Sequence, residues 1–245
     1  MSTNWNDNNN VIDVTHQQTN VLSKSFVSNV MTYMAHALLI SGLVAYMFGT
    51  SETFFSMLYN LETGSRTILG WVVLLAPLGM VFLMGAAVQR MSLTTLFIAF
   101  AAFAVFMGMS LSSIFVIYSL NSIVVTFGVT AGTFGAMALI GYFTKTDLTK
   151  LGSFLYMALI GIILAMVVNW FMHSAMLDYI ISIIGVLVFT GLTAYDMQKI
   201  KQIGLTTDHE SDTGRRLAIL GALTLYLDFI NLFLFLLRFF GGSRD

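Results

Sequence analysis

Two aspartates lie inside apolar stretches of this chain of 245 residues, where an ionised side chain is costly. Asp196 lies in the stretch TAYDMQKIK, and Asp228 lies in LYLDFINLF. A carboxylate that is moved from water into hydrocarbon loses its hydration, so it binds a proton or finds a polar partner. These two residues are therefore the first candidates for a functional site.

The chemistry of two such carboxyls depends on whether they meet. Two buried carboxyls in contact cannot both ionise cheaply, so they share a proton and titrate as a pair. Loss of the shared proton leaves two negative charges that repel each other, and this repulsion favours separation of the helices that carry them. The same oxygens suit Ca2+, which prefers hard oxygen ligands. The pattern therefore predicts a proton-sensitive gate on a cation path, with Asp196 and Asp228 also serving as metal ligands.

The composition indicates what surrounds these residues. The chain is 57% hydrophobic and 9% charged, and its mean hydropathy is +0.84. A soluble domain carries about 25% charged residues, so this balance indicates an integral membrane protein in a lipid bilayer. The net charge of -1 gives no indication of a nucleic-acid partner. The absence of cysteine excludes disulfides, thiolate metal sites and a cysteine nucleophile.

Seven apolar blocks follow the N-terminal segment. Each is long enough to cross a hydrocarbon layer of about 30 Å, which takes roughly 20 helical residues. The expected fold is an all-α membrane protein with a seven-helix transmembrane domain over residues 26–245. Residues 1–25 are polar and rich in asparagine, and they are predicted to form a disordered cytoplasmic tail. The blocks are Phe26–Phe48, Ile68–Gln89, Leu93–Phe115, Asn121–Phe143, Gly152–Phe171, Met176–Ile200 and Leu217–Phe240.

The distribution of lysine and arginine predicts the orientation. With the N-terminus inside, eight of the eleven basic residues fall on the inner side and three on the outer side. The N-terminus is therefore expected in the cytoplasm, and an odd number of crossings puts the C-terminus outside.

The depths of the two aspartates predict that they meet. Asp228 lies 11 residues after Leu217, which is about 16 Å of helical rise from the inner end of the seventh helix. Asp196 lies 8 residues before Gly204, about 12 Å from the inner end of the sixth helix if that helix reaches Gly204. We therefore expect the two carboxyls to face each other.

Two basic residues are candidate partners for the pair. Arg90 ends the second block at the same membrane face, and a charged hydrogen bond from its guanidinium would hold one carboxylate. Lys199 offers a simpler alternative, because it lies at i+3 from Asp196 and could pair with it at the interface.

Polar neighbours extend the face that each aspartate presents. Thr224 and Asn231 lie at i-4 and i+3 from Asp228, and Thr193 lies at i-3 from Asp196. These three side chains are expected to line a narrow wet route beside the pair.

A stripe of small residues on the fourth block has a structural interpretation. Gly128, Gly132 and Ala136 recur at four-residue spacing. We interpret the stripe as helix packing, with a dimer face as the alternative.

Three stretches of this sequence resemble the Bax inhibitor (transmembrane Bax inhibitor motif) family, in its bacterial branch. They are GMSLSSIF (Gly108–Phe115), GLTAYDMQKIK (Gly191–Lys201) and GALTLYLDFINLFLFLLRFFG (Gly221–Gly241). The resemblance covers nearly everything after the N-terminal tail.

The resemblance implies a specific fold and function. It implies that the seventh helix is central and is wrapped by two layers of three helices. It implies a pH-sensitive Ca2+ leak across the bacterial inner (plasma) membrane, with the sensing pair at Asp196 and Asp228. The family's latching arginine falls on Arg90, by its spacing to Gly108.

The sequence also bears on two other classes of function, an intramembrane protease and a non-conducting regulator. An intramembrane aspartyl protease would place Gly-x-Gly before its second aspartate, whereas Tyr226 and Leu227 precede Asp228, and its Pro-Ala-Leu motif is missing. The chain is therefore expected not to be an enzyme. The remaining alternative is a non-conducting regulator that binds a membrane protease or another membrane protein. No cofactor is implied, and Ca2+ enters only as the transported ion.

Overall fold

The structure is a computed structural model that describes the backbone of residues 5–241 and the side chains of residues 23–241. Helices make up nearly all of this part, which also contains an isolated β-bridge between Tyr59 and Arg66. The helices are α1 (Trp5–Thr50), α2 (Glu52–Leu58), α3 (Ile68–Ala87), α4 (Leu93–Leu111), α5 (Ile114–Ile117), α6 (Leu120–Phe143), α7 (Thr149–Met172), α8 (Ala175–Thr206) and α9 (Asp212–Phe240).

Seven helical segments of the described residues are long and apolar enough to cross a membrane, which confirms the predicted seven spans. The third span joins α4 to the short helix α5, over Leu93–Ile117. The sixth span is longer than its apolar block, because α8 continues to Thr206. Asp196 therefore lies well inside a continuous helix.

The backbone of α1 is helical from Trp5 onward. The disordered tail over residues 1–25 stays a prediction. Residues 1–4 of that tail lie outside the described residues. The side chains before Ser23 also lie outside them, so the domain boundary near residue 25 stays a prediction.

Hydroxyl side chains fix where several helices begin. Ser92, Ser119, Ser174 and Ser211 each accept a hydrogen bond from the backbone N–H three residues later. Such N-caps satisfy a donor that has no partner within the helix and are preferred at this position. The polar breaks between the apolar blocks therefore set the register of the helices.

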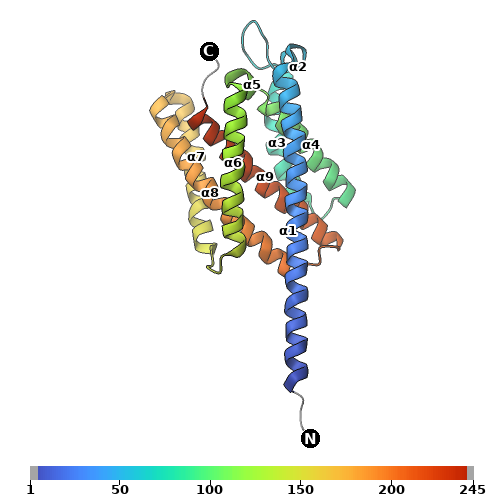
Figure 1. The fold of residues 1–245 in the computed structure, drawn as a ribbon. Coiled ribbons are helices and arrows are strands. Elements are labelled where there is room, and N and C mark those ends of the chain that lie inside the picture. The colour runs from blue at the N-terminus through green and yellow to red at the C-terminus, as the bar shows by residue number, and fades with distance from the viewer. Residues whose placement is uncertain (1–4, 242–245) are drawn as a thin grey trace.

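The seventh span, α9, is the centre of the bundle. Of its apolar window, 67% is buried inside the protein, against 17–33% for the other six spans. It contacts α1, α3 and α4 on one side and α6 and α8 on the other, and α7 packs on α8 (Figure 1). This arrangement confirms the predicted central helix between two layers of three.

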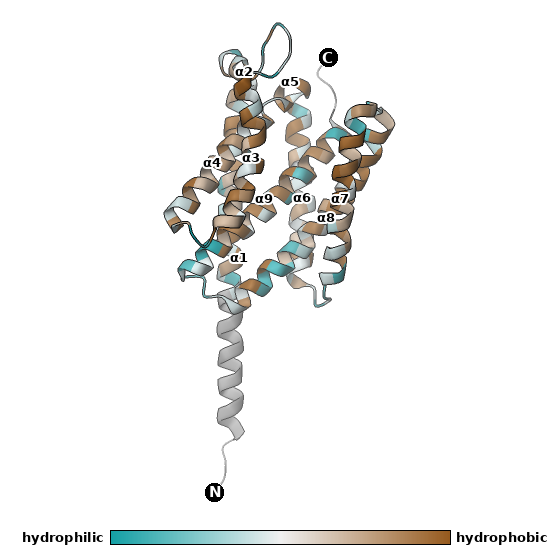
Figure 2. Cartoon of the chain, turned by 180° about the vertical axis from the view of Figure 1, so that it is seen from behind, coloured by the Kyte–Doolittle hydropathy of each residue, from teal (hydrophilic) through white to brown (hydrophobic). Residues whose placement is uncertain are grey.

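The outer surface of the bundle is apolar. Large side chains such as Trp71, Phe82 and Leu164 are exposed along the spans. Figure 2 shows that hydrophobic residues predominate in the helices that form these spans. A surface of this kind is stable in lipid but not in water. The interior is thus the place where α9 can carry polar groups.

Small residues bring the backbones of helices together next to Asp196. A Cβ atom at Gly141 of α6 would collide with the backbone carbonyl of Ala194 in α8. By contrast, a Cβ atom at Gly128 or Gly132 would meet no heavy atom within 4 Å. The interpretation of the 128–132 stripe as packing within the chain is therefore wrong, because these glycines face outward.

These two environments predict opposite effects of the same substitution. Gly141→Ala forces a methyl group against backbone that cannot move aside, at a cost of about 1–3 kcal/mol. Gly132→Ala adds a better helix former in open space, so we expect it to be neutral or slightly stabilising. Thermal unfolding of the purified variants would check this. Equal melting temperatures for the two variants would contradict the close approach of α6 and α8.

Candidate functional site

The structure brings Asp196 and Asp228 together in the interior. Asp196 is 3% exposed and Asp228 is 5% exposed. Their carboxyls interact with each other between α8 and α9, and both line the same cavity. A hydrogen bond between two carboxyls requires a proton on one of them, because an ionised carboxylate only accepts. Such a bond can form between Asp196 and Asp228 only when the pair holds one proton.

A tyrosine that the sequence analysis did not identify completes the pair. The hydroxyl of Tyr156, in α7, donates to Oδ1 of Asp196 at 3.3 Å. Its ring packs edge-on against Tyr195, the neighbour of Asp196. The available signal was a tyrosine hydroxyl about one helical turn into the apolar Gly152–Phe171 block.

Asp228 has fewer hydrogen-bond partners than Asp196. Its Oδ2 atom is buried and has no hydrogen-bond partner among the described residues. A buried oxygen without a donor is costly, and such exceptions call for a functional explanation. The free acceptor is available to a proton, a water molecule or a cation.

The pair opens onto a cavity of about 520 Å³. Both carboxyls line this cavity, and α3, α7, α8 and α9 each contribute to its wall. Most of the lining is apolar, and Arg238 lies at the C-terminal end of the α9 face. The cavity thus connects the buried pair to the end of α9 that is predicted to face outward.

A second cavity adjoins the first. It has a volume of about 600 Å³ and shares Leu78, Leu227, Leu234 and Arg238 with the first. Its other walls come from α3 and α4, and Arg66 also lines it. Both cavities therefore run along one face of α9.

The three predicted supporting residues differ in their placement. Thr224 and Asn231 line the first cavity, whereas Thr193 is buried and does not line it. Thr224, Asn231 and Thr193 each donate to the carbonyl four residues earlier in their own helix. Their oxygen lone pairs remain available as acceptors toward their surroundings.

The two basic residues predicted near the pair do not contact it. Arg90 follows α3 as an exposed residue, and no side-chain hydrogen bond or ion pair of the described residues involves it. Lys199 likewise forms no ion pair within 4.0 Å with Asp196. Instead, Arg216 of α9 donates to the carbonyl of Val88 at the end of α3, at 2.7 Å. This bond ties α3 to the first turn of α9.

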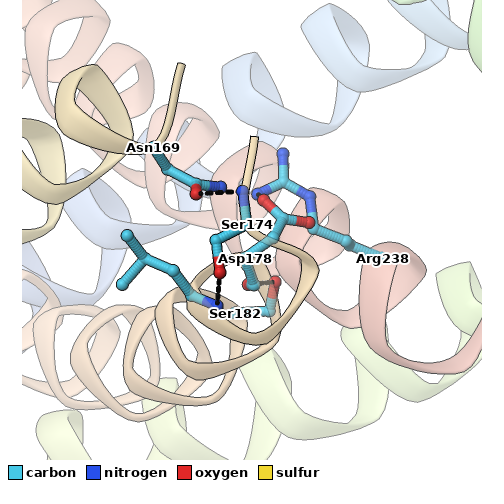
Figure 3. Close-up of polar contacts among 6 residues, drawn as sticks. Asn169, Ser174, Asp178, Ser182 and Arg238 are labelled. Carbon is cyan, nitrogen blue, oxygen red and sulfur yellow. Dashed lines mark hydrogen bonds and ion pairs between the residues drawn. The ribbon is translucent and has the colours of Figure 1, made fainter. Parts of the chain in front are cut away.

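An ion pair lies at the Arg238 end of the cavity. Arg238 Nη1 lies 3.2 Å from Asp178 Oδ1, and the two side chains are 39% and 42% exposed. Figure 3 shows them pointing toward each other from α9 and the first turn of α8. Ser182 donates to the carbonyl of Asp178, and Asn169 Oδ1 accepts from the N–H of Ser174 (Figure 3). The positive charge at the mouth of the cavity is therefore neutralised.

The oxygen atoms around the pair can be compared with the ligands that a bound metal ion requires. Among the described residues, no group of three or more His, Asp or Glu side chains is placed to hold one. Ca2+ takes 6–8 oxygen ligands in a stable site. Two carboxylates with Asn231 and Thr224 nearby fit a transient stop for a hydrated ion better than a permanent metal centre.

Comparison with known proteins identifies similar chains. A family model described as "Inhibitor of apoptosis-promoting Bax1", a Bax inhibitor family, matches residues 23–245. The inner membrane protein YbhL of Escherichia coli is 43% identical over 222 residues, which cover 90% of this chain and 93% of that protein. An uncharacterized protein of Borreliella burgdorferi is 42% identical over 236 residues, which cover 96% of this chain and 100% of that protein.

The cavity lining predicts which positions of α9 water can reach. The chain has no cysteine, so single cysteines can be introduced without background. Asn231→Cys should react with a small water-soluble methanethiosulfonate reagent, because this residue lines the cavity. Ala222→Cys should stay unlabelled, because Ala222 is fully buried. Labelling followed by mass spectrometry measures both, and equal rates at the two positions would contradict a wet cavity.

Proposed function

Because this chain belongs to the Bax inhibitor family, we propose that it is a pH-sensitive leak channel for Ca2+ that is gated by Asp196 and Asp228. The observation that carries the proposal is the buried contact between these two carboxyls at the base of a cavity. We place the protein in the bacterial inner membrane, where the Escherichia coli relative is named as residing. The N-terminus is proposed to lie in the cytoplasm and the C-terminus outside.

The shared proton provides the switch in this proposal. While the proton is present, the two carboxyls hydrogen-bond to each other and hold α8 against α9. When the proton leaves, two negative charges face each other in surroundings that screen them weakly. That state is relieved by separation of the helices or by a cation between the oxygens. Either response links the proton to passage of a cation.

Tyr156 and the Asp178–Arg238 ion pair also have roles in the proposed cation path. The Tyr156 hydroxyl donates to Asp196, so it supports the ionised form of that carboxyl and leaves the shared proton to Asp228. Asp178 neutralises Arg238 at the cavity end and removes a barrier to cations there. Arg90 keeps its proposed latching role only in a conformation in which α3 moves toward the pair.

The test is Ca2+ flux into proteoliposomes at pH 6 and pH 8. We propose that the shared proton exchanges within this range, so we expect the wild-type flux to differ by at least about threefold between the two pH values. Asp228→Asn removes the exchangeable acid, so its flux should be nearly independent of pH, and Asp196→Asn should behave similarly. Higher flux at pH 8 would mean that the deprotonated pair opens the path, and lower flux would mean that it retains the ion.

A matched control separates this effect from surface charge. Asp147→Asn removes a carboxylate in the exposed α6–α7 loop, away from the pair, and should retain the wild-type pH response. Flux no greater than that of empty liposomes at both pH values would refute the leak. The non-conducting regulator of a membrane protease or other membrane protein would then be the better account.

A further inference from the structure

A polar cavity lies at the opposite end of the bundle from the Asp178–Arg238 ion pair. It has a volume of about 620 Å³ and lies between the start of the α1 span and the α8–α9 connection. Lys24 and Ser28 line it from one face of α1, His209 and Glu210 line it from the connection, and Arg215 lines it from α9. None of these residues lines the cavity of the aspartate pair.

The walls of this cavity are held by specific contacts. Ser23, one residue before Lys24, donates its hydroxyl to the carbonyl of Lys201 in α8. Asp208 accepts from the N–H of Glu210 and from the hydroxyl of Ser211, which shapes the connection. A Cβ atom at Gly214 would collide with the carbonyl of Asp208. The cavity is therefore built between two anchored segments.

The cations of the cavity lack partners. Neither Lys24 nor Arg215 forms an ion pair with any of the described residues, although Glu210 lines the same cavity. Nδ1 of His209 is buried and has no hydrogen-bond partner among them. The charges of Lys24, Arg215 and Glu210 sum to about +1. An anion of a single negative charge with several oxygens would satisfy these groups together.

We propose that this cavity binds a phosphodiester group. Lysine and arginine are the usual partners of phosphate oxygens, and hydroxyl and amide side chains such as Ser28 and Asn29 supply further hydrogen bonds. A phosphodiester carries one negative charge, which matches the net charge of the lining. The volume exceeds that of a bare phosphate and leaves room for a substituent on it. The cavity opens where a membrane span begins, so lipid headgroups and soluble diesters both reach it.

The experiment uses the full chain and two probes of the same chemistry. Binding of phosphatidylglycerol is measured by native mass spectrometry of the purified protein, and binding of its soluble headgroup, glycerophosphoglycerol, is measured by calorimetry. The double variant Lys24→Gln/Arg215→Gln should weaken binding by about tenfold or more, since it removes both charged partners. The matched control, Lys145→Gln/Lys150→Gln, removes the same charge from the α6–α7 connection and the first turn of α7 and should bind like wild type.

Glu210→Gln provides an independent readout in the opposite direction. It removes the one acidic group of the lining, so binding should become tighter, which a misfolded variant would not show. If the double variant weakens binding of phosphatidylglycerol alone, the natural ligand is a lipid of the bilayer. If it weakens binding of glycerophosphoglycerol as well, the natural ligand is a soluble diester. The proposal is overturned if wild type binds neither probe, or if the pocket and control variants behave alike. These measurements involve no Ca2+ flux, so their outcome is separate from that of the proposed leak.

Discussion

The structure depends on keeping two carboxyls in contact inside a bundle that is surrounded by lipid. Neither Asp196 nor Asp228 can keep its charge cheaply where both are nearly fully buried, so the pair is stable only with a shared proton or a cation. This constraint explains why α9 is central, since a helix at the lipid surface could not carry Asp228. It also means that a change in the charge of the pair would act on the packing of α8 against α9.

The remaining parts of the bundle support that contact. Gly141 lets α6 approach the backbone of α8 beside Asp196, and Tyr156 of α7 satisfies one oxygen of the same carboxyl. Arg216 ties the end of α3 to the start of α9, while Asp178 and Arg238 tie the start of α8 to the end of α9. These contacts hold the helices together at their ends, and the unpartnered Oδ2 atom of Asp228 lies between them.

The long apolar blocks predicted the seven spans, because hydrophobic length is a direct measure of bilayer crossing. The helical rise also placed Asp196 and Asp228 at matching depths, which depends only on residue counts along two helices.

Tyr156 was not predicted because the rotation of α7 about its own axis is set by tertiary packing. Arg90 was expected to contact the pair because it lies at the same face of the membrane. A shared depth does not make two side chains meet, since α3 and α8 lie in different layers of the bundle. The outward direction of Gly128 and Gly132 was likewise invisible, since small residues favour close packing without specifying the partner.

The central claim is that one exchangeable proton is shared between Asp196 and Asp228. Infrared difference spectroscopy of the purified protein between pH 6 and pH 8 would test it most directly, through the carbonyl stretch of a protonated carboxyl. The account predicts that wild type loses such a band as the pH rises, and that Asp228→Asn and Asp196→Asn each abolish the change. A wild-type band that is retained unchanged in both single variants would contradict the shared proton, because it would then belong to another group.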